Sequence, residues 1–223
     1  MPRALIFANG DFSHPEITRS IVRPDDVIIA ADGGARYALA LGVIPSVIIG
    51  DLDSLTDTEV RVFADMDVHI LRFPQAKDET DLELALLHAL RAGYNPIVIL
   101  GAFGGRLDQT LGNIALISNP EAIQSDVRLE DGITEAFFVT SKAEIHGTPG
   151  DTISFIPWSN PVEGVSTDGL VYPLNNETLF PYRTRSISNQ MLAQTASVNL
   201  RSGLLLCIHI RTSPRTCGVS PEN

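Results

Sequence analysis

Two carboxylates separated by one residue follow an apolar run in the first half of the chain. The run 47–49 ends at Gly50, and Asp51 and Asp53 come directly after it. A short apolar run of this kind is typical of a buried parallel strand, and the glycine marks where the backbone leaves the sheet. In an extended chain the two aspartates would point the same way about 6.6 Å apart, from a rise of ~3.3 Å per residue. Because such close carboxylates repel each other and hard oxygen ligands suit Mg²⁺, the pattern indicates a magnesium site. Taken alone, the segment fits a polar turn that caps the next helix equally well.

Polar residues and glycines follow the other apolar runs of the first half in the same way. They are Asn9, Gly10 and Asp11; Asp32, Gly33 and Gly34; Lys77, Asp78, Thr80 and Asp81; and Gly101, Gly104, Gly105, Arg106 and Asp108. In a parallel sheet all these positions lie along the carboxyl edge, where open α/β folds bind ligands. Glycines there let backbone N–H groups approach phosphate, and helix N-termini favour anions. This clustering at one edge predicts an active site.

Several of these residues have two interpretations. Asp78 and Asp81 frame the start of an expected helix, so one could cap it while the other completes a metal site, or both could only cap. Arg106 could clamp a phosphate while Asp108 orients it, or the two could form a solvated charge pair. The chain has neither a G-x-x-x-x-G-K-[ST] loop nor a G-x-G-x-x-G fingerprint. For a nucleotide, carboxylates and metal would therefore replace the phosphate-binding lysine, and Lys77 is either a helper or a solvated side chain.

The elements that must position these residues alternate through the first half. Apolar runs expected to form strands lie at 5–8, 27–31, 47–49, 68–71 and 97–100, and helix-like stretches lie at 35–41, 59–64, 82–92 and 107–117. Around the stretch 82–92, Thr80 and Glu83 predict a capping box, and Gly93 predicts a C-terminal cap. Strands alternating with helices predict an α/β fold of Rossmann-like type, with a mostly parallel sheet covered by helices on both faces.

Beyond about residue 119 the helical periodicity gives way to short β-type runs. They lie at 136–139, 152–158, 169–173, 195–200 and 204–210, with turn residues between them. Such short strands and frequent turns predict a small antiparallel β-sandwich. We therefore expect an α/β domain over residues 1–125, a sandwich over 126–213 and a frayed polar tail over 214–223.

The composition narrows the class of protein. With 223 residues, 44% of them hydrophobic, the chain can build a globular core. Its net charge of −11 argues against non-specific binding to nucleic acid or anionic membranes, although not against a polyphosphate whose charge metal ions neutralise. No apolar stretch approaches the length of a membrane span, and the first expected strand begins too early for a signal peptide. Cys207 and Cys217 are too few for a disulfide scaffold or a zinc cluster, so we expect a cytoplasmic protein.

The ordered set of motifs resembles the thiamin pyrophosphokinase family. The motifs are Ala31-Asp32-Gly33-Gly34, Gly50-Asp51-Leu52-Asp53-Ser54, Lys77-Asp78-Glu79-Thr80-Asp81, Gly104-Gly105-Arg106-Leu107-Asp108, Gly169-Leu170-Val171-Tyr172-Pro173-Leu174 and Ser186-Ile187-Ser188-Asn189. Each is weak alone, but the ordered set spans nearly the whole chain. The resemblance implies transfer of the diphosphoryl group of ATP to thiamin, which gives thiamin diphosphate and AMP. It also implies a homodimer whose thiamin site is shared between the catalytic domain of one subunit and the sandwich of the other.

The resemblance further implies roles for individual residues. Asp51, Asp53 and Asp81 would hold Mg²⁺, and Arg106 would stabilise charge that develops during transfer. The residues that would arrange the nucleotide and the reacting hydroxyl are Asp32, Gly33, Lys77, Asp78, Thr80 and Asp108. Ser188 and Asn189 would contact the pyrimidine ring of thiamin.

Three other functions fit parts of the pattern. One is the same diphosphoryl transfer onto a different alcohol, such as a pterin. Another is a Mg²⁺- or Mn²⁺-dependent glycosyltransferase, since an Asp-x-Asp at a strand end also binds nucleotide-sugar diphosphates, although it would not explain segments 77–81, 104–108 and 188–189 together. The third is a non-enzymatic thiamin or nucleotide sensor, which is disfavoured because every acidic position that the chemistry needs is present.

Overall fold

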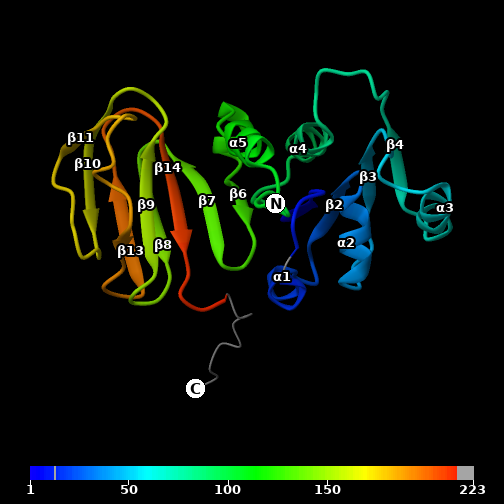
Figure 1. Ribbon diagram of the computed structural model, residues 1–223, viewed down its shortest axis with the longest axis horizontal. Helices are drawn as coiled ribbons and strands as arrows, with labels where there is room; N and C mark the ends of the chain where they lie inside the picture. Colours follow the sequence, from blue (N-terminus) through cyan, green and yellow to red (C-terminus); the bar gives the residue numbers. More distant parts are fainter. Residues whose placement is uncertain (13, 215–223) are drawn as a thin grey trace. The chain divides into compact units, whose positions relative to one another are not determined.

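The chain divides into two units after Gly132 in the computed structural model, which describes residues 1–12 and 14–214 (Figure 1). The first unit is Met1–Gly132, and the second begins at Ile133. The tail expected over residues 214–223 lies outside the described residues except for Pro214, and so does Cys217. No helix in the described part of the chain is long and apolar enough to cross a membrane.

Strands and helices alternate through the first unit. The strands are β1 (Ala4–Phe7), β2 (Val27–Ala31), β3 (Val47–Gly50), β4 (His69–Arg72), β5 (Ile97–Leu100) and β6 (Val127–Glu130). The helices are α1 (Pro15–Ile21), α2 (Gly34–Ala40), α3 (Asp57–Asp65), α4 (Asp81–Arg91), α5 (Leu107–Leu116) and α6 (Pro120–Gln124). The strands pair in parallel in the order β6-β5-β1-β2-β3-β4, which confirms the predicted α/β fold. The sequence patterns did not predict α1, α6 or β6.

The strand order reverses between β1 and β5. From β1 the chain adds β2, β3 and β4 on one side, and β5 then pairs with the other side of β1. In open parallel sheets such a reversal leaves a crevice outside the carboxyl ends of the strands. The two strand ends approach closely here, because a Cβ on Gly10 would collide with the carbonyl oxygen of Gly101. The topology therefore places a ligand crevice at the ends of β1 and β5.

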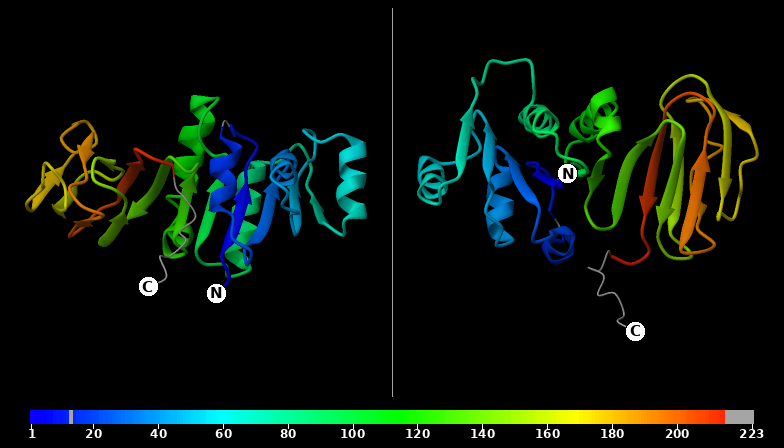
Figure 2. Two further views of the ribbon diagram at one scale, coloured as in Figure 1. Left: turned by 90° about the horizontal axis from the view of Figure 1, so that it is seen from below. Right: turned by 180° about the vertical axis from the view of Figure 1, so that it is seen from behind.

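Helices cover both faces of this sheet, which is why its inner strands β1, β2, β3 and β5 are continuous apolar runs (Figure 2). On one face α1 and α2 contribute to a cluster around Leu5, Phe7 and Ile28. Helix α4 packs on β1, β2 and β3, and its buried residues Leu82, Ala85, Leu86 and Ala89 recur at helical spacing along one side.

Capping fixes where the helices next to the strand ends begin. Thr80 Oγ1 accepts a hydrogen bond from the Glu83 N–H at 3.1 Å, which is one half of the capping box predicted for α4. The complete reciprocal box forms at the start of α3, between Thr56 and Glu59. Both caps lie at the carboxyl edge of the sheet, so they fix the loops that carry the aspartates.

The second unit is the predicted antiparallel sandwich. Its described strands are β7 (Thr134–Val139), β8 (Lys142–His146), β9 (Thr152–Pro157), β10 (Val162–Asp168), β11 (Glu177–Leu179), β12 (Asn189–Gln190), β13 (Thr195–Asn199) and β14 (Leu205–Ile210). They form two layers, β12-β9-β14-β7 and β11-β10-β13-β8. A single buried cluster that includes Phe155 of the first layer and Val165 and Val198 of the second joins them.

The prediction of a strand at residues 169–173 is wrong. Gly169 has a φ of +74°, and Leu170 makes only an isolated bridge with Met191. The chain turns here, and the strand is the more polar segment Val162–Asp168 that precedes it. The apolar residues of the segment belong to a turn whose Leu170 reaches the core.

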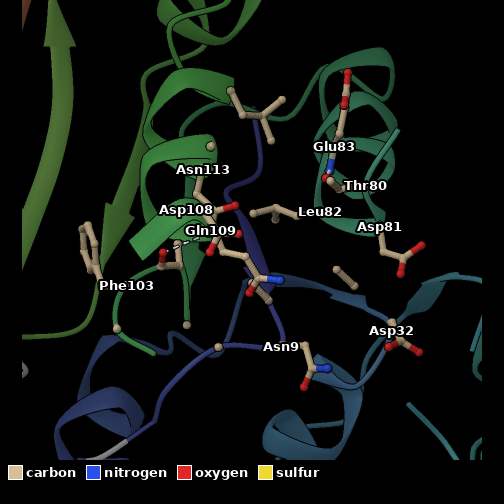
Figure 3. Close-up of a pocket in the computed structure, with 18 of the residues that line it drawn as sticks. Asn9, Asp32, Thr80, Asp81, Leu82, Glu83, Phe103, Asp108, Gln109 and Asn113 are labelled. Carbon is tan, nitrogen blue, oxygen red and sulfur yellow. Dashed lines mark hydrogen bonds between the residues drawn. The ribbon is translucent and has the colours of Figure 1, made fainter. Parts of the chain in front are cut away.

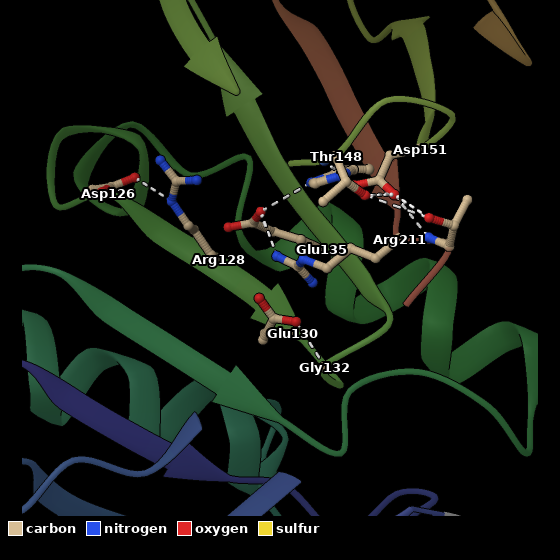
Figure 4. Close-up of polar contacts among 10 residues, drawn as sticks. Asp126, Arg128, Glu130, Gly132, Glu135, Thr148, Asp151 and Arg211 are labelled. Atoms are coloured by element: carbon tan, nitrogen blue, oxygen red, sulfur yellow. Dashed lines mark hydrogen bonds and ion pairs between the residues drawn. The ribbon is translucent and has the colours of Figure 1, made fainter. Parts of the chain in front are cut away.

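A buried polar network in the second unit surrounds Asp151 (Figure 4). This carboxylate is 1% exposed and accepts hydrogen bonds from the N–H groups of Thr148 and Thr212 at 2.9 and 2.8 Å, and His209 Nε2 lies 2.9 Å from it. Burial raises the pKa of Asp151, but the hydrogen bonds from Thr212, Thr148 and His209 outweigh it and hold the pKa well below its usual value. The ionised carboxylate therefore stabilises this unit.

We expect Asp151→Asn to lower the free energy of unfolding at neutral pH by about 2–3 kcal/mol, because the charged acceptor is lost. A carboxylate whose pKa is depressed by folding contributes stability that is present above the unfolded pKa of ~4 and is lost as the pH falls towards the folded pKa. Below about pH 5 the variant should thus lose less stability than the wild type. Thermal unfolding followed by circular dichroism tests this, with the exposed Asp168→Asn as a control expected to change stability by at most about 0.5 kcal/mol. The same pH dependence in wild type and variant would contradict the role given to Asp151.

Candidate active site

Three aspartates from two strand ends converge at the carboxyl edge of the first unit's sheet. Asp32 follows β2, Asp51 and Asp53 follow β3, and one carboxylate oxygen of each lies within 4.8 Å of the others. The extended spacing considered from the sequence does not apply, because Leu52 has a φ of +66° and the Asp53 N–H donates to Asp51 Oδ1 at 3.0 Å. This tight turn, closed by the side chain of Asp51, gathers the two carboxylates.

Asp32 is the most deeply buried member of this group. Asp32 is 4% exposed and has a φ of +45°. Its Oδ1 accepts no hydrogen bond from any residue that the structure describes. A buried carboxylate oxygen without a partner is costly and is expected only where something else binds it. Positive φ values in non-glycine residues also concentrate at functional sites. The orphaned oxygen and the all-carboxylate donor set fit a hard divalent cation.

Asp81, the first residue of α4, lies against the same group. A Cβ on Gly50 would be 2.9 Å from Asp81 Cγ and 3.1 Å from Asp32 Cβ, so a glycine is needed to let both carboxylates close in. Asp81 Oδ1 forms an ion pair with Lys77 Nζ at 2.9 Å. Burial raises the pKa of Asp81, and with the neighbouring charges of Asp51 and Asp32 it outweighs the hydrogen bond and charge of Lys77, which lower it. Asp81 therefore adds a fourth carboxylate beside the three that share the 4.8 Å group.

The loop between β4 and α4 brings two donors onto these carboxylates. Lys77 Nζ lies 2.9 Å from Asp81 and 3.6 Å from Asp51 Oδ2, and the lysine side chain is only 11% exposed. Gln75 Nε2 donates to Asp53 Oδ2 at 3.1 Å. The interpretation of Lys77 as a solvated side chain is therefore wrong, whereas Asp78 in the same loop is exposed.

Asp32, Asp53 and Asp81 line a cavity of about 620 Å³ at the crevice between β1 and β5 (Figure 3). This volume lies in the range of ~300–1,000 Å³ that is typical of small-molecule sites. Asp32 and Asp81 lie on one side of it and Asp108 and Gln109 on the other. The polar residues among its lining are Asn9, Asp32, Asp53, Ser54, Thr80, Asp81, Glu83, Asp108, Gln109 and Asn113. Because the N-terminus of α4 also faces the cavity, its backbone dipole favours an anion there.

Arg106 and Asp108 form a bidentate pair at the start of α5. Arg106 Nε lies 3.1 Å from Asp108 Oδ1, and a terminal nitrogen lies 2.5 Å from Oδ2. Their hydrogen bond raises the pKa of Arg106 and lowers that of Asp108. The side chains are 70% and 66% exposed, so the pair is weak and can be exchanged for another partner. Asp108 lines the cavity, whereas Arg106 is not among its lining residues.

Arg36 of α2 supports the loop that carries Asp51 and Asp53. Its guanidinium donates to the carbonyl oxygen of Ser54 at 2.9 Å and to both oxygens of Glu59 at 2.7 and 3.0 Å. The hydrogen bonds from Arg36 and Thr56 lower the pKa of Glu59 to about 2. Asn9 Nδ2 reaches the hydroxyl of Ser54 at 3.2 Å. Nothing in the sequence singled out Arg36 or Glu59, because their contacts depend on how the loop turns.

The residues expected to contact thiamin, Ser188 and Asn189, lie in the second unit. Asn189 is 7% exposed, and its amide exchanges hydrogen bonds with the backbone of Tyr172, at 3.0 Å to the N–H and 2.7 Å to the carbonyl oxygen. Ser188 is exposed, with a φ of +58° and its N–H bonded to Ser154 Oγ at 3.0 Å. Asn189 thus holds the turn around Tyr172, and Ser188 is accessible beside it.

Comparison with known proteins identifies the family. Residues 18–129 match the family model described as "Thiamin pyrophosphokinase, catalytic domain", and residues 141–205 match "Thiamin pyrophosphokinase, vitamin B1 binding domain". The chain belongs to the thiamin pyrophosphokinase family. Thiamine pyrophosphokinase from Bacillus subtilis (strain 168) is 33% identical over 182 residues, which cover 81% of this chain and 85% of that protein. Thiamine pyrophosphokinase 1 from Arabidopsis thaliana is 26% identical over 232 residues, 93% of this chain and 86% of that protein.

Solved structures of thiamin pyrophosphokinases share the fold. The crystal structure of the Bacillus subtilis thiamine pyrophosphokinase superposes with a TM-score of 0.84 at 30% identity and covers 95% of this chain and 100% of that one. The thiamin pyrophosphokinase from Candida albicans superposes with a TM-score of 0.76 over 94% of this chain and 89% of its own. Its identity is 20%, so this second likeness concerns the fold alone. These matches confirm the family resemblance inferred from the motifs.

We expect Gly50→Ala to weaken divalent-cation binding by at least about tenfold while the protein remains folded. A Cβ there would push apart Asp81 and Asp32, and the φ of +155° is unfavourable for alanine. Isothermal titration with Mn²⁺ measures the effect. Gly93→Ala is the matched control, because Gly93 has a φ of +76° but no atom within 4 Å of an added Cβ. It should cost about 1 kcal/mol of stability and leave metal affinity unchanged. Equal losses of metal affinity in the two variants would show that backbone strain alone is responsible.

Proposed function

We propose that this protein transfers the diphosphoryl group of ATP to the hydroxyl of thiamin, which yields thiamin diphosphate and AMP. Membership of the thiamin pyrophosphokinase family supports this activity. The observation that carries the proposal is the convergence of Asp32, Asp51 and Asp53, of which Asp32 and Asp53 line the cavity, while the buried Oδ1 of Asp32 has no hydrogen-bond partner among the described residues. A site that must neutralise a polyphosphate needs this concentration of metal-binding oxygens.

We propose Mg²⁺ as the metal, held by Asp32, Asp51 and Asp53, with Asp81 beside them. The family resemblance implied Asp51, Asp53 and Asp81 as ligands, whereas the group whose oxygens lie within 4.8 Å of one another contains Asp32 in place of Asp81. Hard carboxylate oxygens and a polyphosphate substrate favour Mg²⁺ over softer ions. When bound, the ion would neutralise phosphate oxygens and hold the triphosphate chain in one orientation.

The reaction requires mainly positioning and charge neutralisation. The hydroxyl oxygen of thiamin forms a bond to the β-phosphorus, and the bond from the β-phosphorus to the oxygen bridging to the α-phosphorus breaks. AMP leaves with that electron pair, and the hydroxyl proton is released. Arg106 is suited to stabilise the charge that develops, because its exposed pair with Asp108 can be exchanged for a phosphate contact.

We propose that ATP occupies the cavity of the first unit. The resemblance implied six nucleotide-binding residues, and three of them, Asp32, Thr80 and Asp108, line the cavity. Gly33 follows Asp32 in the chain, and Lys77 contacts Asp51 and Asp81. Asp78 is exposed in the loop between β4 and α4. The glycine-rich turn from Gly101 to Gly104 offers backbone N–H groups to phosphate, and the N-terminus of α4 offers a favourable field.

We further propose a homodimer in which the sandwich of one subunit completes the thiamin site of the other. The match of residues 141–205 to a vitamin B1 binding domain supports a role of the second unit in binding thiamin. Ser188 is accessible there, next to the exposed apolar side chains of Tyr172, Ile187 and Leu192, which are 63%, 46% and 61% exposed. A partner subunit or an aromatic ligand would cover such side chains.

Incubation with ATP, Mg²⁺ and thiamin should release AMP and form thiamin diphosphate in equal amounts. Chromatography of the nucleotides, with a pterin alcohol or a nucleotide sugar supplied in separate reactions, distinguishes the alternatives. Release of ADP, or turnover with the pterin but not with thiamin, would overturn the assigned activity. Tight binding of thiamin or ATP without any turnover would favour a sensor.

We expect Asp53→Asn to lower turnover by at least about a hundredfold, because one charge that holds the metal is lost. Circular dichroism should show an intact fold, since Asp53 is exposed. Asp65→Asn, an exposed carboxylate at the end of α3, is the matched control and should retain full activity. Near-normal turnover of Asp53→Asn with Mg²⁺ as the only metal would refute the role given to this carboxylate.

A further inference from the structure

Lys77 occupies the position where the aspartate group needs positive charge. Its ammonium bridges Asp81 at 2.9 Å and Asp51 at 3.6 Å, and its side chain is only 11% exposed. Elsewhere in the same loop Gln75 donates to Asp53. Lys77 therefore forms ion pairs with two of the four gathered carboxylates and Gln75 donates to a third, whereas the buried Oδ1 of Asp32 has neither contact among the described residues.

One ammonium cannot balance this group of charges. The aspartates bring up to four negative charges to one place, and close carboxylates repel each other strongly where burial lowers the effective dielectric constant. Lys77 supplies one positive charge, and Gln75 supplies only a dipole. A divalent cation that binds Asp32, Asp51 and Asp53 would supply more charge and satisfy the orphaned oxygen. It would also repel an ammonium that stays within 4 Å of the same carboxylates.

We propose that Lys77 is a placeholder cation: it compensates the aspartates while no metal is bound, and it leaves Asp51 when the metal arrives. This inference rests on the proposed function, because the released ammonium is then free to contact the phosphates that come with the metal. The loop has the freedom for such a change, since residues 73–76 and 78–80 are exposed and lie outside any helix or strand. Lys77 is thus a positioning residue whose partner changes with the state of the site.

Two other roles for Lys77 make different predictions. If the lysine formed a purely structural ion pair, its loss would destabilise the protein equally with and without metal, and metal affinity would not change. If it bound only phosphate, its loss would weaken nucleotide binding alone. A placeholder opposes the metal, so its removal must strengthen metal binding in the absence of nucleotide.

The first experiment compares variants without nucleotide or thiamin. Lys77→Met removes the charge and keeps the length of the side chain, and Lys77→Arg keeps the charge. Lys142, the other lysine of the chain, is exposed on β8, so Lys142→Met is the matched control. We expect Lys77→Met to bind Mn²⁺ about tenfold more tightly than wild type by isothermal titration, and the other two variants to stay within about twofold. In EDTA the melting temperature of Lys77→Met should be lower than that of the wild type, and with saturating Mg²⁺ it should recover towards the wild-type value.

The second experiment uses the wild-type protein. Because the chain contains only Lys77 and Lys142, reductive ¹³C-dimethylation gives two lysine signals, which Lys77→Arg assigns. The modified amine keeps its charge and one N–H. On addition of Mg²⁺ alone, the Lys77 signal should move towards that of the exposed Lys142, and the Lys142 signal should not change.

Unchanged Mn²⁺ affinity in Lys77→Met, or a Lys77 signal that does not move at saturating Mg²⁺, would overturn the proposal. Neither measurement involves thiamin or turnover. A protein that shows this exchange but forms no AMP would refute the proposed function and leave the placeholder role intact.

Discussion

Electrostatic repulsion among closely packed carboxylates is the constraint on which the active-site region depends. Asp32, Asp51 and Asp53 place oxygens within 4.8 Å of one another, and Asp81 is pressed against Gly50 beside them. Such an arrangement persists only if the fold imposes it and positive charge compensates it. The parallel sheet imposes the arrangement, because its strand ends lie side by side. Lys77 supplies part of the compensating charge, and a bound cation would supply the rest.

The backbone around the aspartates is adapted to this crowding. Asp32 and Leu52 adopt positive φ values directly after β2 and β3, and Gly50 provides room for two carboxylates at once. The supporting contacts lie outside the group, where Arg36 holds the carbonyl oxygen of Ser54. Each of these two strained segments is short and lies between a strand and a helix. Because Asp32 and Asp53 line the crevice beside β1, a polyphosphate bound there would lie next to these carboxylates.

The sequence predicted those parts of the structure that depend on local patterns. Parallel strands buried on both faces appear as unbroken apolar runs, and α4 appears as a helical stripe that ends in Gly93. The strand at 169–173 was wrong because its apolar residues serve a turn, and the true strand Val162–Asp168 is too polar to show the pattern. The aspartates were found because each follows a strand. The contacts of Gln75, Arg36 and Lys77 could not be found, because they depend on loop conformations that no periodicity encodes.

The two units contain buried carboxylates with opposite environments, and the contrast separates stability from function. Asp151 in the sandwich is satisfied by Thr148, Thr212 and His209, and its depressed pKa shows that the protein itself stabilises the charge. Asp32 is nearly as buried, yet one of its oxygens lacks any described partner. A fold that satisfies one buried carboxylate completely can satisfy another. The unsatisfied oxygen of Asp32 is therefore available to a cation, and it supports the proposal of a metal site at the ends of β2 and β3.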